Sequence, residues 1–249
     1  MKSIQTVYKS IFGQALEPMG FIYSKQMKFF FRLINGEIIQ FIILKPGPSK
    51  LEGYKDFSVS AGIRTIYTET MEKDLFLNST RSLMHFGGLG LTYEQRGPLL
   101  STPYSDATIE ESVNFALEKT LEYIIPRFSE VTDLASCIEY YKGHGLSMLK
   151  RADSFSEDSL ILIKANNHDT FMSELHESVA RDLKGLKEGK AGDDYDSTYE
   201  LFYRAFITFT AEPRDRVYND PELYAKALAE IERRAAANLE VLKSYGLPI

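Results

Sequence analysis

Two runs of β-branched and aromatic residues flank an Asn-Gly pair at positions 35–36, within residues 27–45. Asn and Gly tolerate the positive φ that a two-residue type I′ turn needs at both of its central positions. The pattern therefore predicts a β-hairpin in which Phe30 lies opposite Phe41. Opposed residues share a face of a sheet. In this register one face carries Met27, Phe29, Phe31, Leu33, Ile38, Gln40, Ile42 and Leu44.

The segments on either side of the hairpin predict a helix and further strands, which together indicate an α+β arrangement. Apolar residues recur at helical spacing over residues 3–17, which predicts a helix. The Pro-Gly-Pro run at 46–48 predicts the end of the second strand. Residues 57–64 alternate strictly and predict a third strand with only small residues on one face, and residues 82–86 indicate a further strand.

The rest of the chain has a helical pattern. Thr108 with Glu111 three residues later predicts a capping box that opens a helix, and Pro126 predicts its end. Further helices are expected near 133–142, 157–165, 168–188, 195–210 and 220–245. The fold class that follows is α+β. Residues 1–128 are expected to form an antiparallel sheet with flanking helices, and residues 129–249 an all-α domain packed on it.

Composition narrows the class of protein further. The chain has 249 residues and a single cysteine, Cys137, which excludes a disulfide framework and fits a reducing cytoplasm. No signal-peptide pattern begins the sequence, and no apolar run approaches the roughly 20 residues of a membrane helix. A cytoplasmic protein without membrane association is therefore expected.

Charge is divided unevenly along the chain. Residues 1–128 carry 14 Lys and Arg against 13 Asp and Glu, whereas residues 129–249 carry 15 against 22. The absence of a dense basic stripe makes nucleic acid an improbable partner. A protein partner attracted by the acidic second half is expected to be basic.

The first half resembles an uncharacterised bacterial family, domain-of-unknown-function family 4304. The resemblance covers about residues 3–128 and rests on structural positions: the helix end at 16–21, the strands at 29–32 and 38–41, and the small-residue strand at 57–63. It implies an α+β domain of the bacterial cytoplasm, without a catalytic signature to transfer. Small domains of this kind sometimes act as immunity or accessory proteins.

Candidate chemical groups are sparse. His168 and His176 stand eight residues apart on one expected helix, which is too far for one metal ion. Cys137 lies on an apolar helix face, where a buried and unreactive thiol is expected. The acidic residues at 193–196 suit a helix start better than a cation site. We therefore expect no metal, no cofactor and no catalytic residue.

Three functional hypotheses remain. The first is non-catalytic binding of a protein partner, with Tyr199, Tyr203 and Arg204 as the contact group, since Tyr and Arg are enriched at interfaces. The second is an enzyme with a cleft between the sheet and the helical half. Its candidate residues are His85, Arg64 and Tyr67. The third is RNA binding on the aromatic sheet face, which the acidic net charge of −6 disfavours.

Overall fold

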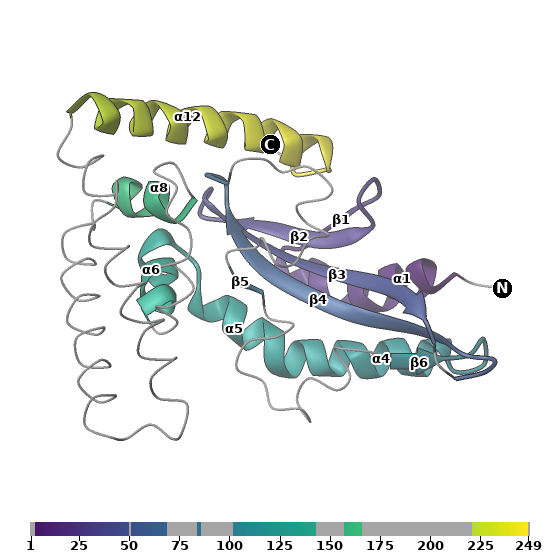
Figure 1. Cartoon of the computed structure of the whole chain (residues 1–249). Coiled ribbons are helices and arrows are strands. Elements are labelled where there is room, and N and C mark those ends of the chain that lie inside the picture. Colours follow the sequence, from purple (N-terminus) through teal and green to yellow (C-terminus); the bar gives the residue numbers. More distant parts are fainter. Residues whose placement is uncertain are drawn as a thin grey trace, which may run out of the picture. The chain divides into compact units, whose positions relative to one another are not determined.

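A computed structural model describes residues 3–49, 51–68, 84–85, 102–142, 157–165 and 221–248. It confirms the α+β class, with an antiparallel sheet and helices (Figure 1). The chain divides into two compact units. Unit 1 consists of Met1–Asp133 with Ala236–Ile249, and unit 2 of Leu134–Ala235. The expected division into 1–128 and 129–249 stays a prediction, but the last turns of the chain group with the sheet.

Unit 1 is built on a sheet in which β1 to β5 follow one another in sequence order, while β6 pairs with β4. All pairs are antiparallel. The long β3–β4 hairpin forms its centre, with 11 residues in each strand. The strands are β1 (Ile22–Ser24), β2 (Phe29–Ile34), β3 (Ile38–Pro48), β4 (Lys55–Thr65), β5 (Met84–His85) and β6 (Thr102–Tyr104). The strand expected at 57–64 is thus confirmed, and the described part of the strand expected at 82–86, residues 84–85, forms β5.

The β2–β3 hairpin pairs one residue out of the expected register. Phe31 lies opposite Phe41, and Phe30 lies opposite Ile42, so the predicted pairing of Phe30 with Phe41 is wrong. A slip of one residue exchanges the two faces of a strand, and the expected faces are therefore mixed. One true face carries Phe30, Arg32, Ile34, Ile38, Gln40 and Ile42, and the other Phe29, Phe31, Leu33, Ile39, Phe41 and Ile43.

The slip arises at Glu37, which the pairing leaves out of the ladder. Asn35 and Gly36 do adopt the expected positive φ, of 51° and 74°. The carbonyl of Glu37, however, accepts a 2.9 Å hydrogen bond from the N–H of Ile66. Its carboxylate accepts another from the hydroxyl of Tyr67. These contacts with the segment after β4 occupy Glu37, so it acts as an extra loop residue.

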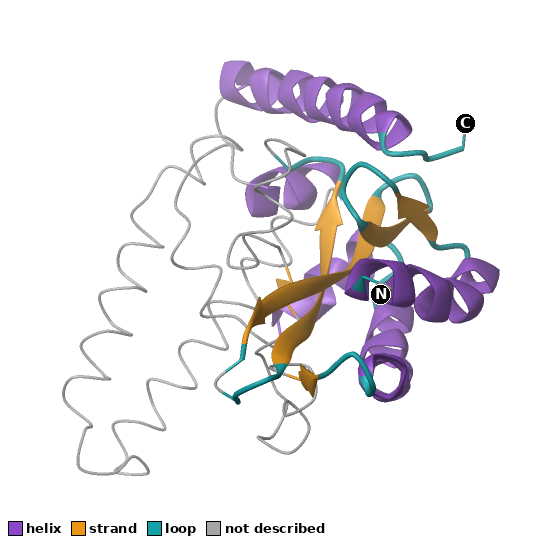
Figure 2. Cartoon of the chain, turned by 90° about the vertical axis from the view of Figure 1, so that its right-hand side faces the viewer, coloured by secondary structure: helices purple, strands orange, loops and turns teal. Residues whose placement is uncertain are grey.

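Three helices lie on one side of the sheet (Figure 2), and contacts of Tyr8 and Phe128 show that this is the side of Phe30 and Gln40. They are α1 (Ile4–Leu16), α4 (Ile109–Lys119) and α5 (Ile125–Glu130). On α1, Tyr8 is fully buried, donates to the carbonyl of Ile42 at 2.8 Å and packs edge-on to Phe30 at 5.3 Å. At the other end, Gln40 donates to the carbonyls of Phe128 and Val131, at 2.6 and 2.9 Å. These contacts tie α1 and the end of α5 to this face of the sheet.

The helix that begins at Ile109 does not end at Pro126, contrary to expectation. A wider π-helical turn at Thr120–Ile124 separates α4 from α5, and Pro126 lies in the first turn of α5. A proline has no N–H to donate to the carbonyl four residues earlier. Extra backbone taken up in a π turn accommodates that missing bond without breaking the helix.

The strand β3 also continues where a break was expected. Pro46 and Pro48 pair in register with Phe57 and Lys55 of β4. The pairing of β2 with β3 ends at Ile43, so β3 is an edge on that side from there on. Prolines are tolerated on edge strands because the missing N–H costs no ladder bond.

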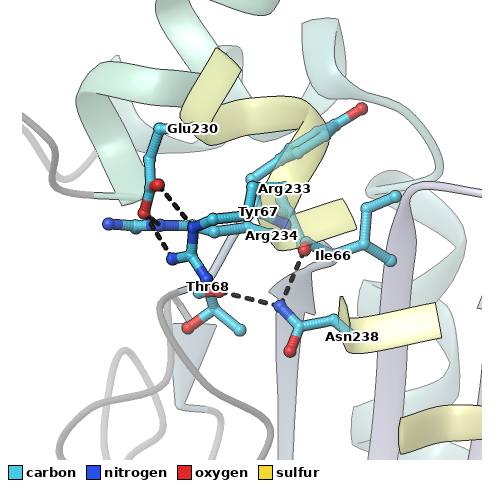
Figure 3. Close-up of polar contacts among 8 residues, drawn as sticks. Ile66, Tyr67, Thr68, Glu230, Arg233, Arg234 and Asn238 are labelled. Carbon is cyan, nitrogen blue, oxygen red and sulfur yellow. Dashed lines mark hydrogen bonds and ion pairs between the residues drawn. The ribbon is translucent and has the colours of Figure 1, made fainter. Parts of the chain in front are cut away.

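The second sheet face packs on the end of the chain. Phe29 contacts the ring of Tyr245 edge-on at 6.5 Å. Asn238, which is buried in the helix α12 (Pro221–Ser244), donates to the carbonyls of Ile66 and Thr68, both at 2.8 Å (Figure 3). These bonds satisfy two carbonyls of the chain just after β4. They explain why the last turns of α12 belong to unit 1.

Unit 2 contains α6 (Leu134–Lys142), α8 (Glu157–Lys164) and the first part of α12. The helices expected at 133–142, 157–165 and 220–245 are confirmed, whereas those at 168–188 and 195–210 lie outside the described residues. Cys137 is buried on α6, as expected. On α12, Glu230 forms ion pairs with Arg233 and Arg234 at 2.7 and 2.6 Å (Figure 3).

Candidate binding groove

A shallow groove of about 670 Å³ opens on the surface of unit 1. Its lining comes from three elements that the fold brings together: the β3–β4 turn, the strand β6 and the exposed side of α4. The antiparallel pairing of β6 with the start of β4 places the turn next to the strand. The lining residues are Tyr54, Thr102, Pro103, Thr108, Glu111, Ser112, Asn114, Phe115 and Glu118.

Two aromatic side chains in this groove are unusually exposed. Tyr54 is 45% exposed and Phe115 is 44% exposed. Leu51, in the same turn as Tyr54, is 55% exposed, and its carbonyl accepts the N–H of Tyr54 at 3.2 Å. Large apolar side chains gathered at one place on a surface, and rimmed by polar groups, are typical of an interaction site.

The capping box expected at the start of α4 does not form, and this leaves a carboxylate in the groove. The helix does begin after Thr108, but the Thr108 hydroxyl accepts the N–H of Ser105 at 2.9 Å instead of capping α4. Glu111, the other half of the expected box, is exposed and lines the groove. Within the described part of the chain, the side chain of Glu111 forms neither a hydrogen bond nor an ion pair.

The second carboxylate of the groove is Glu118, seven residues further along α4. Lys119 lies 3.7 Å from it but bonds closely, at 2.7 Å, to Glu122. The hydrogen bond to Glu122 raises the pKa of Lys119, and the same bond lowers the pKa of Glu122. The strongest contact of Lys119 is thus with Glu122, although its ammonium also lies over the ring of Phe115, 5.8 Å from the centroid. The described lining itself contains two acidic residues and no Lys or Arg.

The groove combines polar and acidic side chains with exposed aromatic rings. The described lining offers hydroxyls, an amide and carboxylates, but no His or Cys to act as a base or a nucleophile. Across the described residues, no group of three or more His, Cys, Asp or Glu could hold a metal ion. Aromatic faces beside carboxylates attract cationic groups, because the ring face is negative and the carboxylates carry full charge.

Two of the three residues expected in an enzyme cleft, Arg64 and Tyr67, have structural contacts. Arg64 is buried and donates to the hydroxyl of Thr68 at 2.9 Å. Tyr67 is buried too and donates to Glu37; burial first, and that hydrogen bond second, raise the pKa of its hydroxyl. His85 lies opposite Gly62, which places it on the sheet face of Arg64.

The other predicted contact group lies outside the described residues: Tyr199, Tyr203 and Arg204. Tyr54, Phe115, Glu111 and Glu118 were not singled out from the sequence. One signal could have found Phe115: it is a large aromatic residue on the polar side of α4, away from the buried Ile109, Val113 and Ala116. Tyr54 is likewise an aromatic residue within a polar turn.

Within the described ranges, no helix is long and apolar enough to cross a membrane. No family model, curated protein or solved structure matches the chain. The resemblance of residues 3–128 to an uncharacterised bacterial family therefore stays a prediction. The groove of unit 1 is the feature on which a functional argument can rest.

Proposed function

We propose that the chain is a non-catalytic binding protein that holds a basic segment of a protein partner in the groove between the β3–β4 turn and α4. The observation that carries this proposal is the exposure of Tyr54 and Phe115 in a groove lined by Glu111 and Glu118. A role of the immunity or accessory kind, exerted by binding alone in a bacterial cytoplasm, fits such a site.

The aromatic residues argue for a protein partner. Tyrosine and other large aromatic side chains are frequent anchors of protein interfaces, because they bury much surface and lose little rotamer freedom. The turn contributes a third apolar side chain, Leu51, next to Tyr54. Exposing such a group to water costs solubility, and covering it by a partner removes that cost.

The charge of the chain argues for a basic partner. The net charge is −6, and the described lining of the groove is acidic. A second copy of this chain would bring the same negative charge and is disfavoured. Attraction between opposite charges speeds encounter, and salt weakens it because charges are screened over about 10 Å at 0.1 M.

The test is capture of partners from the source cell on the immobilised full chain, as wild type and as Phe115→Ala and Tyr54→Ser. We expect a partner whose affinity falls about tenfold or more in each variant, because each variant removes an interface anchor. We also expect its affinity to fall further at high salt. Met19→Ala is the matched control, since Met19 is also an exposed apolar residue, 39% exposed, but lies outside this groove.

Each partner identified is then measured with the purified variants. Equal affinity of wild type, Phe115→Ala and Tyr54→Ser for every captured protein would overturn the proposal. So would a partner set that depends on Met19 and not on Phe115. Circular dichroism on each variant shows that the fold is intact.

A further inference from the structure

The groove presents a regular stripe along α4. Glu111, Phe115 and Glu118 follow at i, i+4 and i+7, the spacing of one helix face. At a rise of about 1.5 Å per residue, the two glutamates stand about 10 Å apart along the axis with the ring between them. A carboxylate thus lies on either side of an exposed aromatic face.

We infer that this stripe recognises an arginine side chain of the partner, a conclusion that rests on the proposed function of the groove. A guanidinium is planar, stacks on aromatic rings and donates in a fork to carboxylates, whereas an ammonium is a strongly hydrated point charge. Phe115 supplies the ring, and Glu111 supplies an acceptor that is not engaged with another described side chain.

The same unit already contains a guanidinium held in this way. The guanidinium of Arg32 lies 4.5 Å from the ring centroid of Phe21 and donates to Gln40 Oε1 at 2.8 Å and to the carbonyl of Met19 at 2.7 Å. The Lys119 ammonium lies over the ring of Phe115, 5.8 Å from its centroid, at the outer limit of a cation–π contact, while it bonds to Glu122 at 2.7 Å. Because the Phe115 side chain nevertheless remains 44% exposed, its ring can still be reached by a guanidinium of the partner.

Recognition by side chains is favoured over addition of a strand to β6. Strand addition needs a row of free backbone donors and acceptors on the sheet edge. At the middle of β6, Pro103 has no N–H, and its carbonyl accepts the hydroxyl of Ser112 at 3.3 Å. The partner segment is thus held by what its side chains contact.

The experiment uses fluorescein-labelled pentapeptides of the pattern Gly-X-Leu-X-Gly, with X as arginine, lysine or citrulline, titrated with the full chain and followed by anisotropy. We expect the lysine peptide to bind about two- to fivefold more weakly than the arginine peptide, the value of an exposed cation–π contact. Citrulline keeps the planar shape of arginine without its charge. We expect the citrulline peptide to bind at least about tenfold more weakly than the arginine peptide.

Two variants test the stripe. Phe115→Leu keeps an apolar residue but removes the ring, so the preference for arginine over lysine should disappear. Glu111→Gln should weaken the arginine peptide about two- to fivefold and leave the citrulline peptide unchanged. Equal binding of the arginine and citrulline peptides, or an arginine preference that survives Phe115→Leu, would overturn the inference.

N-acetylarginine amide tests whether a small cation is the ligand instead. We expect it to bind at least about tenfold more weakly than the peptide, because the segment contributes further contacts; equal affinity would overturn the choice of a protein segment. The results of these peptide titrations can be distinguished from the results of the capture experiment that tests the proposed function. If the peptides do not bind but capture of a partner still depends on Phe115, only the assignment of arginine is wrong. If the peptides bind but no partner is captured in a Phe115-dependent way, only the proposed function is wrong.

Discussion

The Arg32–Gln40 cluster and the groove along α4 contain similar side chains, but those of the cluster bond to one another and those of the groove face solvent. In the cluster, Arg32 stacks on Phe21 and donates to Gln40, and Gln40 in turn donates to Phe128 and Val131. Gln40 is fully buried, and its bonds join the hairpin to the end of α5.

The groove has an aromatic ring and carboxylates, but they face solvent. Phe115 is 44% exposed, and Glu111 has no partner in the described part of the chain. Buried polar groups are bonded internally because leaving them unpaired costs about 1–3 kcal/mol each. Exposed ones carry no such constraint and remain able to bind another molecule. The contrast indicates that the Arg32–Gln40 cluster serves stability, and it supports the recognition role that we propose for the groove.

The largest effect should separate two phenylalanines. Phe29→Ala removes a ring that is 1% exposed and contacts Phe31, Phe41 and Tyr245. We expect a loss of about 3–5 kcal/mol in the free energy of unfolding. Phe115→Ala should change it by no more than about 0.5 kcal/mol. Urea denaturation of both variants measures the difference, and equal midpoints would show that Phe115 belongs to the core.

A smaller effect should follow from opening the closed cluster. Gln40→Leu keeps the volume but leaves the carbonyls of Phe128 and Val131 without their donor, and the Nε of Arg32 without the Gln40 acceptor. We expect a loss of about 1–3 kcal/mol in unfolding free energy. Asn114→Leu in the groove is the matched control, since its amide bonds only within its own exposed helix turn. A Gln40→Leu variant as stable as this control would contradict the assigned role.

The smallest effect concerns a carboxylate that is paired within the chain, unlike Glu111. Hydrogen bonds from Arg233, and then from Arg234, lower the pKa of Glu230 to about 2. Because the folded pKa lies below the ordinary value of about 4.3, its contribution to stability is present above that value and is lost as the pH falls towards 2. The difference in unfolding free energy between wild type and Glu230→Gln should therefore shrink between about pH 5 and pH 2.

The control for that titration is Glu232→Gln on the same helix, which removes no ion pair found among the described residues. The pH dependence of the Glu230→Gln variant is read relative to this control. A Glu230→Gln difference that does not vary with pH would show that the ion pairs on α12 contribute nothing to stability.

Local chemistry in the sequence was sufficient for most of the elements, although not for β6 or for the ends of β3 and α4. The alternation of residues 57–64 predicted β4, and the apolar stripes predicted α1 and most of the described helices. The conformation of the turn was also local, because Asn35 and Gly36 adopt the positive φ that asparagine tolerates and that glycine, without a side chain, adopts freely. These features depend on neighbours within a few residues, which is the range over which a sequence pattern is informative.

Tertiary contacts decided the register and the groove. Glu37 left the ladder because Ile66 and Tyr67, about 30 residues away along the chain, supply it with other partners. Glu111 became a groove residue because Ser105 donates to Thr108 and no capping box formed. Tyr54 and Phe115 share a groove only because β6 pairs with β4. Each outcome depends on which hydrogen-bond partners folding brings together. The spacing of residues in the sequence does not reveal those partners.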